Sequence, residues 1–342
     1  MIIRARAPLR LGLAGSGTDV SPYCDMYGGN ILNATIDRYA YTIIKILNEP
    51  YVRFAATDQQ QEKVELIDEP LILNGKLDLH KAVYNQMIRR YNNGKPIALE
   101  LSTFCDAPPG SGLGASSTLV VTMIKAFEEL FNLSLDDYTL AQLAFKIERI
   151  DCGLQGGRQD QYSATFGGFN FMEFYAEDRA VINPLRIKSW IICELEASLL
   201  LFYTGVSRES AKIIADQSDN VTTGMVDAIE AMHAMKQEAF VMKECLLKGD
   251  FDGIVKSMRR GWESKKRSAK TVSNPHIEDI YNATIAAGAL AGKISGAGGG
   301  GFMVFFVPPD KRMEVIRKLN QFEGQVSNCH FTKHGTLSWR VL

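Results

Sequence analysis

A glycine-rich segment in the middle of the chain has the residue types of a phosphate-binding loop. It reads Pro108-Pro109-Gly110-Ser111-Gly112-Leu113-Gly114-Ala115-Ser116-Ser117-Thr118, between an expected strand at 97–104 and an expected helix at 115–130. The glycines allow positive φ angles and close approach of the backbone to a ligand. The helix that follows offers free N–H groups and the positive end of its dipole. These features together predict an anion site, although a glycine-rich turn with a Ser/Thr cap would explain the same segment without a ligand.

The segment differs from two common kinase signatures. No G-x-x-x-x-G-K-[ST] pattern occurs, and neither Lys95 nor Lys293 has the spacing of a P-loop lysine. The sequence at 250–253, Asp-Phe-Asp-Gly, is not the D-F-G of protein kinases, and no H-R-D catalytic loop accompanies it. A nucleotide bound at this segment would therefore be held in another fold.

Two further segments connect the loop to a known family. The chain reads Ala7-Pro8-Leu9-Arg10 and Ala14-Gly15-Ser16-Gly17-Thr18-Asp19 near its start, and Ser295-Gly296-Ala297-Gly298-Gly299-Gly300-Gly301 near its end. These three segments, in this order, resemble the three motifs of the GHMP kinases, the family of galactokinase, homoserine kinase, mevalonate kinase and phosphomevalonate kinase. The details at 14–19, 157–162 and 261–266 are closest to the bacterial members that act on D-glycero-D-manno-heptose 7-phosphate.

The resemblance implies a kinase that uses ATP and Mg²⁺. The residues expected to bind ATP are Pro109, Gly110, Ser111, Gly112, Leu113, Gly114, Ala115, Ser116 and Ser117. In the family, a Ser of this loop and a Glu in the place of Glu148 ligate Mg²⁺. Alignment of the glycines makes Ser116 the serine ligand, with Ser117 as the second choice. Without the resemblance, Glu148 would be read as a solvated carboxylate paired with a neighbouring cation.

Asp160 and Arg10 are the expected catalytic residues. Asp160 lies in the glycine-containing stretch 156–161, twelve residues after Glu148, at the place of the family's catalytic aspartate. A carboxylate there can take the proton of an attacking hydroxyl, although an Asx-turn is the alternative interpretation. Arg10 lies between leucines of an expected strand, where a buried guanidinium needs an anionic partner. We expect that partner to be Asp160; a surface Arg on an edge strand is the alternative.

The expected substrate residues come from both ends of the chain. Thr18 and Asp19 occupy the place that lies over the sugar hydroxyls in sugar-specific family members, and Gly298 belongs to the hairpin that positions the substrate. A basic run follows Arg259, and on a helix its positions 259, 262, 263 and 266 share one face. We expect Lys266 and Arg267 to contact the phosphate of the substrate, and the other cations to form a solvated surface.

Composition excludes several classes of protein. The 342 residues are 46% hydrophobic and 23% charged, with a net charge of −1, which is typical of a globular protein without a nucleic-acid or acidic-membrane partner. No apolar stretch has the length of a membrane span or follows the N-terminal arginines as in a signal peptide. The six scattered cysteines indicate a reducing compartment, and we expect a cytoplasmic location. The oligomeric state is left open.

Hydrophobic patterning predicts a β-rich first half and an α+β second half. In the first half it predicts strands at about 2–14, 30–36, 40–47, 51–56, 62–67 and 97–104, helices at about 78–92, 115–130 and 136–149, and a glycine-rich loop at 151–169. In the second half it predicts helices at 208–217, 220–248, 251–265, 275–287 and 310–320, and strands at 198–203, 293–295 and 301–307. We expect an α+β fold with two tightly packed domains, 1–180 and 181–342. The family resemblance implies a ribosomal-protein-S5-like fold for the first and a ferredoxin-like fold for the second.

The resemblance also implies a function. We expect an ATP-dependent sugar-phosphate kinase that phosphorylates the anomeric hydroxyl of D-glycero-D-manno-heptose 7-phosphate to give the 1,7-bisphosphate, for the synthesis of nucleotide-activated heptose. Two alternatives stay open, because a shared fold does not fix a substrate. The first is another GHMP substrate, such as fucose, galactose or a mevalonate-type alcohol. The second is a sugar and nucleotide sensor without turnover.

Overall fold

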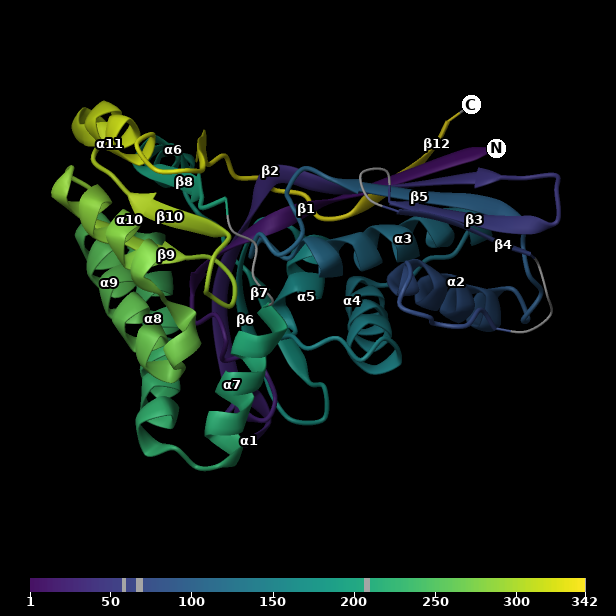
Figure 1. The fold of residues 1–342 in the computed structure, drawn as a ribbon, viewed down its shortest axis with the longest axis horizontal. Coiled ribbons are helices and arrows are strands. Elements are labelled where there is room, and N and C mark those ends of the chain that lie inside the picture. Colours follow the sequence, from purple (N-terminus) through teal and green to yellow (C-terminus); the bar gives the residue numbers. More distant parts are fainter. Residues whose placement is uncertain (57–59, 66–69, 206–209, 342) are drawn as a thin grey trace.

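The computed structural model describes residues 1–56, 60–65, 70–205 and 210–341, and the strands of this part of the chain form two sheets (Figure 1). The strands of the larger sheet are β1 (Ile2–Ala14), β2 (Gly29–Ile46), β3 (Tyr51–Ala56), β4 (Gln60–Glu65), β5 (Leu99–Cys105), β6 (Phe169–Phe174), β7 (Ala180–Pro184) and β12 (Leu337–Val341). They pair in the order β12-β1-β2-β5-β3-β4, with β6 on β2 and β7 on β6. The smaller sheet contains β8 (Leu199–Tyr203), β9 (Ala291–Ile294), β10 (Phe302–Phe306) and β11 (Gln325–Asn328), in the order β11-β8-β10-β9.

The two longest strands, β1 and β2, connect the two halves of the molecule. They pair in antiparallel register from Ile2 opposite Lys45 to Ala14 opposite Leu32, with register shifts after Pro8 and Gly12. The sequence predicted two strands within 30–47, and this prediction was wrong, because β2 runs unbroken from Gly29 to Ile46. The N-terminal part of β2 pairs with β6 and its C-terminal part pairs with β5, so this one strand belongs to two different parts of the sheet.

Helices cover one face of the larger sheet (Figure 1). They are α2 (Asp78–Tyr91), α3 (Ala115–Phe131), α4 (Asp137–Phe145) with a π-helical turn that continues it (Lys146–Asp151), and α5 (Gln159–Phe166); the short α1 (Tyr23–Tyr27) lies between β1 and β2 in the sequence. Apolar residues of α3 recur at helical spacing, with Val120, Ile124 and Phe127 all buried against the sheet. This core fixes the helix whose first turn follows the glycine-rich loop.

The second half packs helices around the smaller sheet. They are α6 (Ser189–Ser198), α7 (Ser210–Thr222), α8 (Val226–Lys248), α9 (Phe251–Ser268), α10 (Pro275–Ala286) and α11 (Arg312–Leu319), with short 3-10 turns at Lys270–Val272 and Pro309–Lys311. Each of α9 and α10 begins at a side-chain cap, since Asp250 accepts from the Gly253 N–H and Asn274 from the Ile277 N–H. The α+β class expected from the sequence is confirmed.

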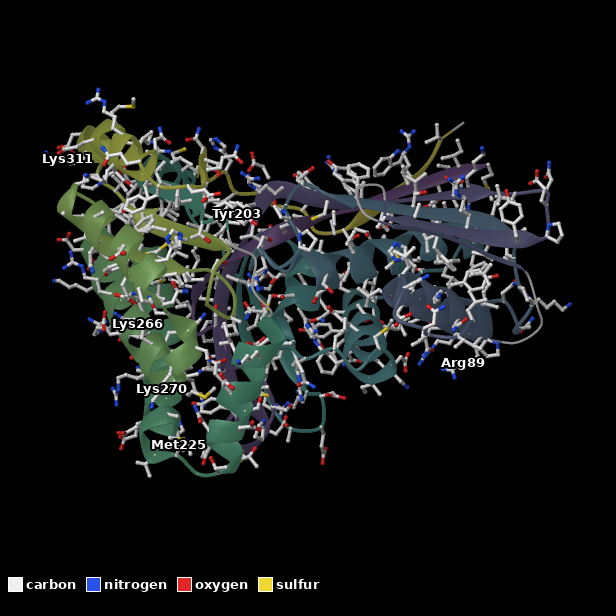
Figure 2. All side chains as sticks on the ribbon, in the orientation of Figure 1. Arg89, Tyr203, Met225, Lys266, Lys270 and Lys311 are labelled. Carbon is white, nitrogen blue, oxygen red and sulfur yellow. The ribbon has the colours of Figure 1, made fainter. Side chains whose placement is uncertain are left out.

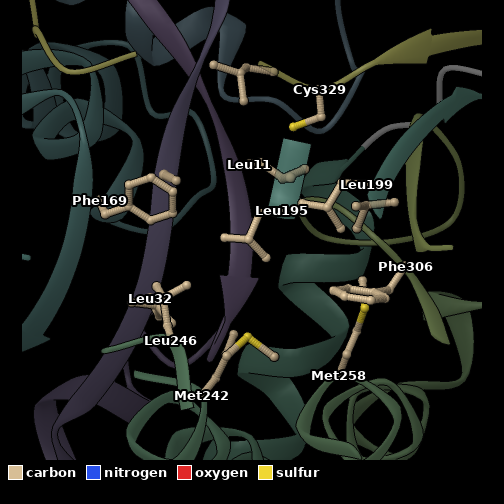
Figure 3. Packing of buried hydrophobic residues seen from close by; sticks show 14 of the residues in the cluster. Leu11, Leu32, Phe169, Leu195, Leu199, Met242, Leu246, Met258, Phe306 and Cys329 are labelled. Carbon is tan, nitrogen blue, oxygen red and sulfur yellow. The ribbon is translucent and has the colours of Figure 1, made fainter. Parts of the chain in front are cut away.

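One hydrophobic core extends across both halves (Figure 3). Leu11 and Leu32 from the long strands of the larger sheet share this core with Met242 of α8, Met258 of α9 and Phe306 of β10. Truncating a fully buried leucine in such a core costs about 2–5 kcal/mol, so the contact between the halves is strong. This shared core holds in one fixed arrangement the residues that the two halves contribute to the cavity described below.

The chain returns to the larger sheet at its end. Strand β12 pairs with β1, from Ile2 opposite Val341 to Arg6 opposite Leu337, and Phe331 forms an isolated bridge with Ile36. Strand β7 spans the position at which the sequence was divided into domains 1–180 and 181–342. That division stays a prediction.

Several elements differ from the sequence prediction. The expected loop at 151–169 contains α5. The helix expected over 220–248 begins only at Val226, and the preceding helix α7 extends to Thr222. Strands β6 and β7 and helix α6 were not predicted. Residues 66–67 of an expected strand and 208–209 of an expected helix lie outside the described residues. Within the described part of the chain, no helix has the length and apolar character needed to cross a bilayer.

Candidate active site

A cavity of about 260 Å³ brings together all three glycine-containing segments. The first segment contributes Arg10, Ser16, Gly17, Asp19 and Val20, the middle one Gly110–Gly112 and Gly114–Ser117, and the last one Gly296 and Ala297. Further lining residues come from the turn before α5, from α7 and from α9: Glu148, Arg149, Leu154, Gln155, Gly156, Gly157, Gln159, Asp160, Ser210, Ala211, Ile214, Gln217 and Lys265. Leu113 and Pro109, which the sequence placed among the ATP-binding residues, do not line this cavity.

The glycine-rich loop packs its backbone directly against the last segment. Gly112 has a φ of +78°, and a Cβ on it would lie 2.4 Å from the Ser295 carbonyl oxygen. The Phe302 N–H donates to the Ser111 carbonyl oxygen at 2.9 Å, and the Ser295 hydroxyl donates to the Gly112 carbonyl oxygen at 3.1 Å. Larger residues would separate these segments, so glycine is required here for close approach as well as for the positive φ.

The loop ends at an open helix N-terminus. The N-cap of α3 is Gly114, with a left-handed φ of +79° and no side-chain cap among the described residues. The first N–H groups of α3 therefore have no intrahelical acceptor and face the loop. The buried Ser111 hydroxyl also has no hydrogen-bond partner in the described part of the chain. This combination suits a phosphate group.

Arg10 and Asp160 form an ion pair at the wall of the cavity. The Arg10 Nε donates to Asp160 Oδ1 at 2.7 Å, and the side chains are 6% and 18% exposed. Arg10 also donates from Nη1 to the Gly112 carbonyl oxygen at 2.6 Å, which ties β1 to the loop. Asp160 lies in the first turn of α5, where the helix dipole favours a carboxylate. The two residues expected to be catalytic are thus in direct contact.

Glu148 and Ser116 are also in contact. Glu148 is buried in the π-helical turn, and its Oε1 accepts from the Ser116 hydroxyl at 2.6 Å. The other carboxylate oxygen accepts from Gln161 Nε2 at 2.7 Å, and Arg149 Nη1 lies 3.3 Å from Oε1. The Ser116 hydroxyl and the Glu148 carboxylate place two hard oxygen atoms and one negative charge side by side. These fit part of the coordination shell of Mg²⁺, which phosphate and water would complete. The Ser117 hydroxyl instead accepts from Arg149 and Gln161.

Asp19 connects the first segment to the start of α5. Its Oδ2 accepts from the backbone N–H groups of Arg158 at 2.9 Å and Gln159 at 3.0 Å, and its Oδ1 accepts from Gln159 Nε2 at 3.2 Å. A Cβ on Gly157 would lie 2.0 Å from that Oδ2. The hydroxyl of Thr18, by contrast, is fully buried and exchanges hydrogen bonds with the backbone of Asn30. Of this expected pair, Asp19 lines the cavity and Thr18 does not.

The other three expected substrate residues lie outside the cavity. Lys266 forms ion pairs with Glu263 at 3.0 Å and Glu278 at 3.6 Å and lies among the outer helices (Figure 2), and Arg267 is exposed. Gly298 packs against the backbone of Val272, where a Cβ would lie 2.7 Å from the carbonyl oxygen. We therefore correct the substrate site expected from the sequence by leaving these three residues out.

Lys265 is the cation of α9 that lines the cavity. The residue is 3% exposed, and its Nζ donates to the Gly296 carbonyl oxygen. Burial, together with the nearby charge of Arg10 and against the opposing effect of Asp19, lowers the pKa of Lys265 to about 7. The sequence predicted that positions 259, 262, 263 and 266 share one face of the helix. The buried face of α9 instead contains Met258, Trp262 and Lys265. Their spacing of four and three residues was the signal that could have identified Lys265.

Two lining residues that were not predicted have buried polar atoms without a partner in the part of the chain that the structure describes. The Ser16 hydroxyl and Gln159 Oε1 are buried and have no hydrogen-bond partner among the described residues. Buried polar atoms are nearly always paired in folded proteins, so unpaired ones at a cavity indicate a ligand or water. No sequence pattern marks these two atoms, since their pairing depends on the tertiary arrangement.

Comparison with known proteins fits this geometry. The family model described as "GHMP kinases N terminal domain" matches residues 78–168, and "GHMP kinases C terminal" matches residues 242–324. This chain belongs to the GHMP kinase family. It is a kinase, and the family implies the use of ATP, as the sequence predicted. The matched ranges contain the phosphate loop, Glu148 and Asp160 in the first model and Lys265 and the last glycine segment in the second.

Individual proteins of known name can also be compared with this GHMP kinase. It is 47% identical over 339 residues, 99% of each chain, to a D-glycero-alpha-D-manno-heptose 7-phosphate kinase from Campylobacter jejuni. A crystal structure of a D-glycero-D-manno-heptose 1-phosphate kinase from Bacteroides thetaiotaomicron superposes with a TM-score of 0.84 at 43% identity, covering 99% of each chain. An L-fucokinase/L-fucose-1-P guanylyltransferase from Bacteroides fragilis is 25% identical over 93% of this chain and 36% of its own. The two-domain GHMP kinase architecture is confirmed.

Proposed function

We propose that this GHMP kinase transfers the γ-phosphoryl group of ATP to the anomeric hydroxyl of D-glycero-D-manno-heptose 7-phosphate, giving the 1,7-bisphosphate for the synthesis of nucleotide-activated heptose. The observation that supports this most is the 47% identity to the Campylobacter jejuni heptose 7-phosphate kinase over 99% of both chains. The relatives named for fucose, galactose or mevalonate are at most 27% identical among those compared. We also propose a cytoplasmic location.

Asp160 and Arg10 act on the reacting groups in this proposal. The anomeric oxygen attacks the γ-phosphorus, the bond from that phosphorus to the β,γ-bridging oxygen breaks, and ADP leaves with the electron pair. Asp160 orients the hydroxyl and accepts its proton. Arg10, 2.7 Å from Asp160, orients the carboxylate and stabilises negative charge on the transferring group. In a loose transition state, orientation by Asp160 contributes as much as its basicity.

The loop at 109–117 holds the phosphates of ATP. Its glycines expose backbone N–H groups, and the uncapped start of α3 adds a positive dipole end. Ser116 and Glu148 would hold Mg²⁺, which would neutralise negative charge on the phosphates of ATP. Gln161 and Arg149 fix the Glu148 carboxylate, so its oxygen is already oriented before the metal arrives.

Asp19, Ser16 and Gln159 form the sugar side of the site. The unpaired Ser16 hydroxyl and Gln159 Oε1 are free to bond with sugar hydroxyls. Asp19 already accepts several N–H groups, so it mainly holds the start of α5, and with it Asp160, in place. A heptose offers more hydroxyls than mevalonate, in keeping with this polar lining.

A coupled ADP-release assay tests the proposal. The panel contains heptose 7-phosphate, heptose 1-phosphate, unphosphorylated heptose, fucose, galactose and mevalonate, each with ATP and Mg²⁺. We expect the highest kcat/KM with heptose 7-phosphate. Preference for heptose 1-phosphate would match the name of the Bacteroides thetaiotaomicron relative instead, and binding of sugar and ATP without turnover would identify a sensor.

A further inference from the structure

Two buried lysine amines lie beside the proposed active site without a carboxylate partner. Lys265 of α9 and Lys293 of β9 are 3% and 6% exposed, and within the described ranges neither forms an ion pair. Each Nζ donates to a main-chain carbonyl oxygen, of Gly296 for Lys265 and of Leu13 for Lys293. A buried cation is normally paired, so this arrangement leaves positive charge to be matched by something that binds.

The nearby carboxylates are already engaged. Asp160 pairs with Arg10, and Asp19 accepts two backbone N–H groups and the Gln159 amide. Arg10 raises the positive potential at Lys265, while Asp19 is the acidic group that opposes it. An uncharged sugar would leave the Lys265 ammonium desolvated and unpaired, whereas a phosphate dianion would match it.

Lys265 lies beside the last glycine segment, because its Nζ donates to the Gly296 carbonyl oxygen. It lines the main cavity and also a second, small cavity beneath the first segment, whose lining includes Ala14, Gly15, Ser16, Trp262 and Lys293. This is the side on which the unpaired Ser16 hydroxyl lies. The γ-phosphoryl side already has Arg10 and the N-terminus of α3.

From these contacts we propose that Lys265 binds the phosphate that the sugar substrate already carries, and thereby selects a phosphorylated sugar over a free one. The assignment rests on the proposed function for the identity of the substrate. Lys293 lines the small cavity and not the main one. Lys265 is therefore the specificity residue.

The test compares two substrates in two variants. The kcat/KM for heptose 7-phosphate and for unphosphorylated heptose is measured in wild type, Lys265→Met and Lys266→Met. Methionine keeps the length and the apolar stem of lysine without the charge. Lys266 is the matched control, because it is the next residue of the same helix and pairs with Glu263 and Glu278 outside the cavity.

We expect Lys265→Met to lower the ratio of the two kcat/KM values by about 30- to 1000-fold, the effect of truncating one member of a buried charge pair. Lys266→Met leaves the ratio at its wild-type value, and Lys265→Arg restores part of it. Equal losses for both substrates in Lys265→Met would overturn the assignment, because they would place Lys265 at the transferring phosphoryl group. A wild-type protein without activity on heptose 7-phosphate would refute the proposed function instead. Failure of the Lys265 assignment and failure of the proposed function are therefore distinguishable. Thermal unfolding of each variant confirms that it is folded.

Discussion

At the scale of single residues, the pair formed by Arg10 and Asp160 is the centre of the proposed chemistry. The two groups come from β1 and α5, 150 positions apart in the chain, and lie 2.7 Å from each other at the cavity. We predict that Asp160→Asn binds ATP nearly as wild type does but lowers kcat by about 10²–10⁴-fold, the usual contribution of a general base. Calorimetric titration of ATP and steady-state kinetics measure the two quantities. A variant with wild-type kcat would remove Asp160 from the mechanism.

A second prediction at this scale concerns the metal. Ser116→Ala and Glu148→Gln each remove an oxygen ligand or its charge, so both should raise the Mg²⁺ concentration needed for half-maximal rate. Titration of Mg²⁺ at fixed ATP measures the shift. Ser117→Ala is the matched control, because the Ser117 hydroxyl is occupied by Arg149 and Gln161. A shift in Ser117→Ala alone would mean that the neighbouring serine is the ligand.

The sequence pointed most reliably to residues that line the cavity where a motif fixed their register. Glycine spacing led to Ser116, and the distance of Asp160 from Glu148 led to the carboxylate that contacts Arg10. The prediction failed for Lys266 and Arg267, because a basic run contains no information on which of its members turns inward. The rotation of α9 is set by the packing of Met258 and Trp262, and that packing turns Lys265 to the cavity.

At the scale of elements, the turn before α5 depends on a glycine. A Cβ at Gly157 would lie 2.0 Å from Asp19 Oδ2, so Gly157→Ala must displace the carboxylate that holds the start of α5. We predict a loss of about 1–3 kcal/mol in the free energy of unfolding, as for other overpacked sites, with a lower kcat/KM. Urea denaturation and steady-state kinetics measure both.

The control for this variant is Gly261→Ala. Gly261 lies within α9 with open space around its Cβ position, so alanine there should preserve or raise stability. If Gly157→Ala proves as stable and active as Gly261→Ala, the contact between Asp19 and the start of α5 is not important for the site.

Helix α2 contains a histidine that should make stability depend on pH. His80 is buried, its Nε2 lies 2.9 Å from the Thr103 hydroxyl, and burial lowers its pKa from 6.5 to about 4. Between these two values the unfolded chain binds the proton and the folded chain does not, so stability falls as the pH falls through this window. The contribution amounts to about 2 kcal/mol at pH 5 relative to pH 8.

Urea denaturation at pH 8 and pH 5 isolates this effect when wild type is compared with His80→Gln, which cannot titrate. We expect wild type to lose more stability on acidification than the variant, by about 1–2 kcal/mol. An equal loss in both proteins would show that His80 does not contribute to the acid sensitivity. Titrating carboxylates are common to both proteins and cancel in the comparison.

Periodicity located the long elements and missed those whose apolar signal is weak. Helices α2, α3 and α9 have strong amphipathic patterns, and each was expected close to its observed range. Helix α5 was missed, because Gly156 and Gly157 precede it and its first turn is polar. The tertiary contact that stabilises this turn is Asp19, which lies far away in the sequence.

At the scale of the whole molecule, the cavity exists because two halves share one core. Leu11 and Leu32 of the long strands pack with Met242 and Met258 of the α8–α9 pair (Figure 3). The phosphate loop and Lys265, which belong to different halves, therefore line the same cavity. The sequence predicted two packed domains but not the return of β12 to β1, since pairing of the two chain ends leaves no local pattern. The change from a β-rich to an α+β pattern suggested that two halves meet, and the family resemblance implied the same arrangement.

The most direct test of the central claim is the ³¹P nuclear magnetic resonance spectrum of the product formed from heptose 7-phosphate, ATP and Mg²⁺. We predict a second phosphomonoester signal that couples to the anomeric proton, together with one equivalent of ADP, and neither in Asp160→Asn over the same time. A new phosphate on any other carbon, or release of ADP without a new sugar phosphate, would contradict the assignment of this GHMP kinase as an anomeric kinase of a phosphorylated heptose.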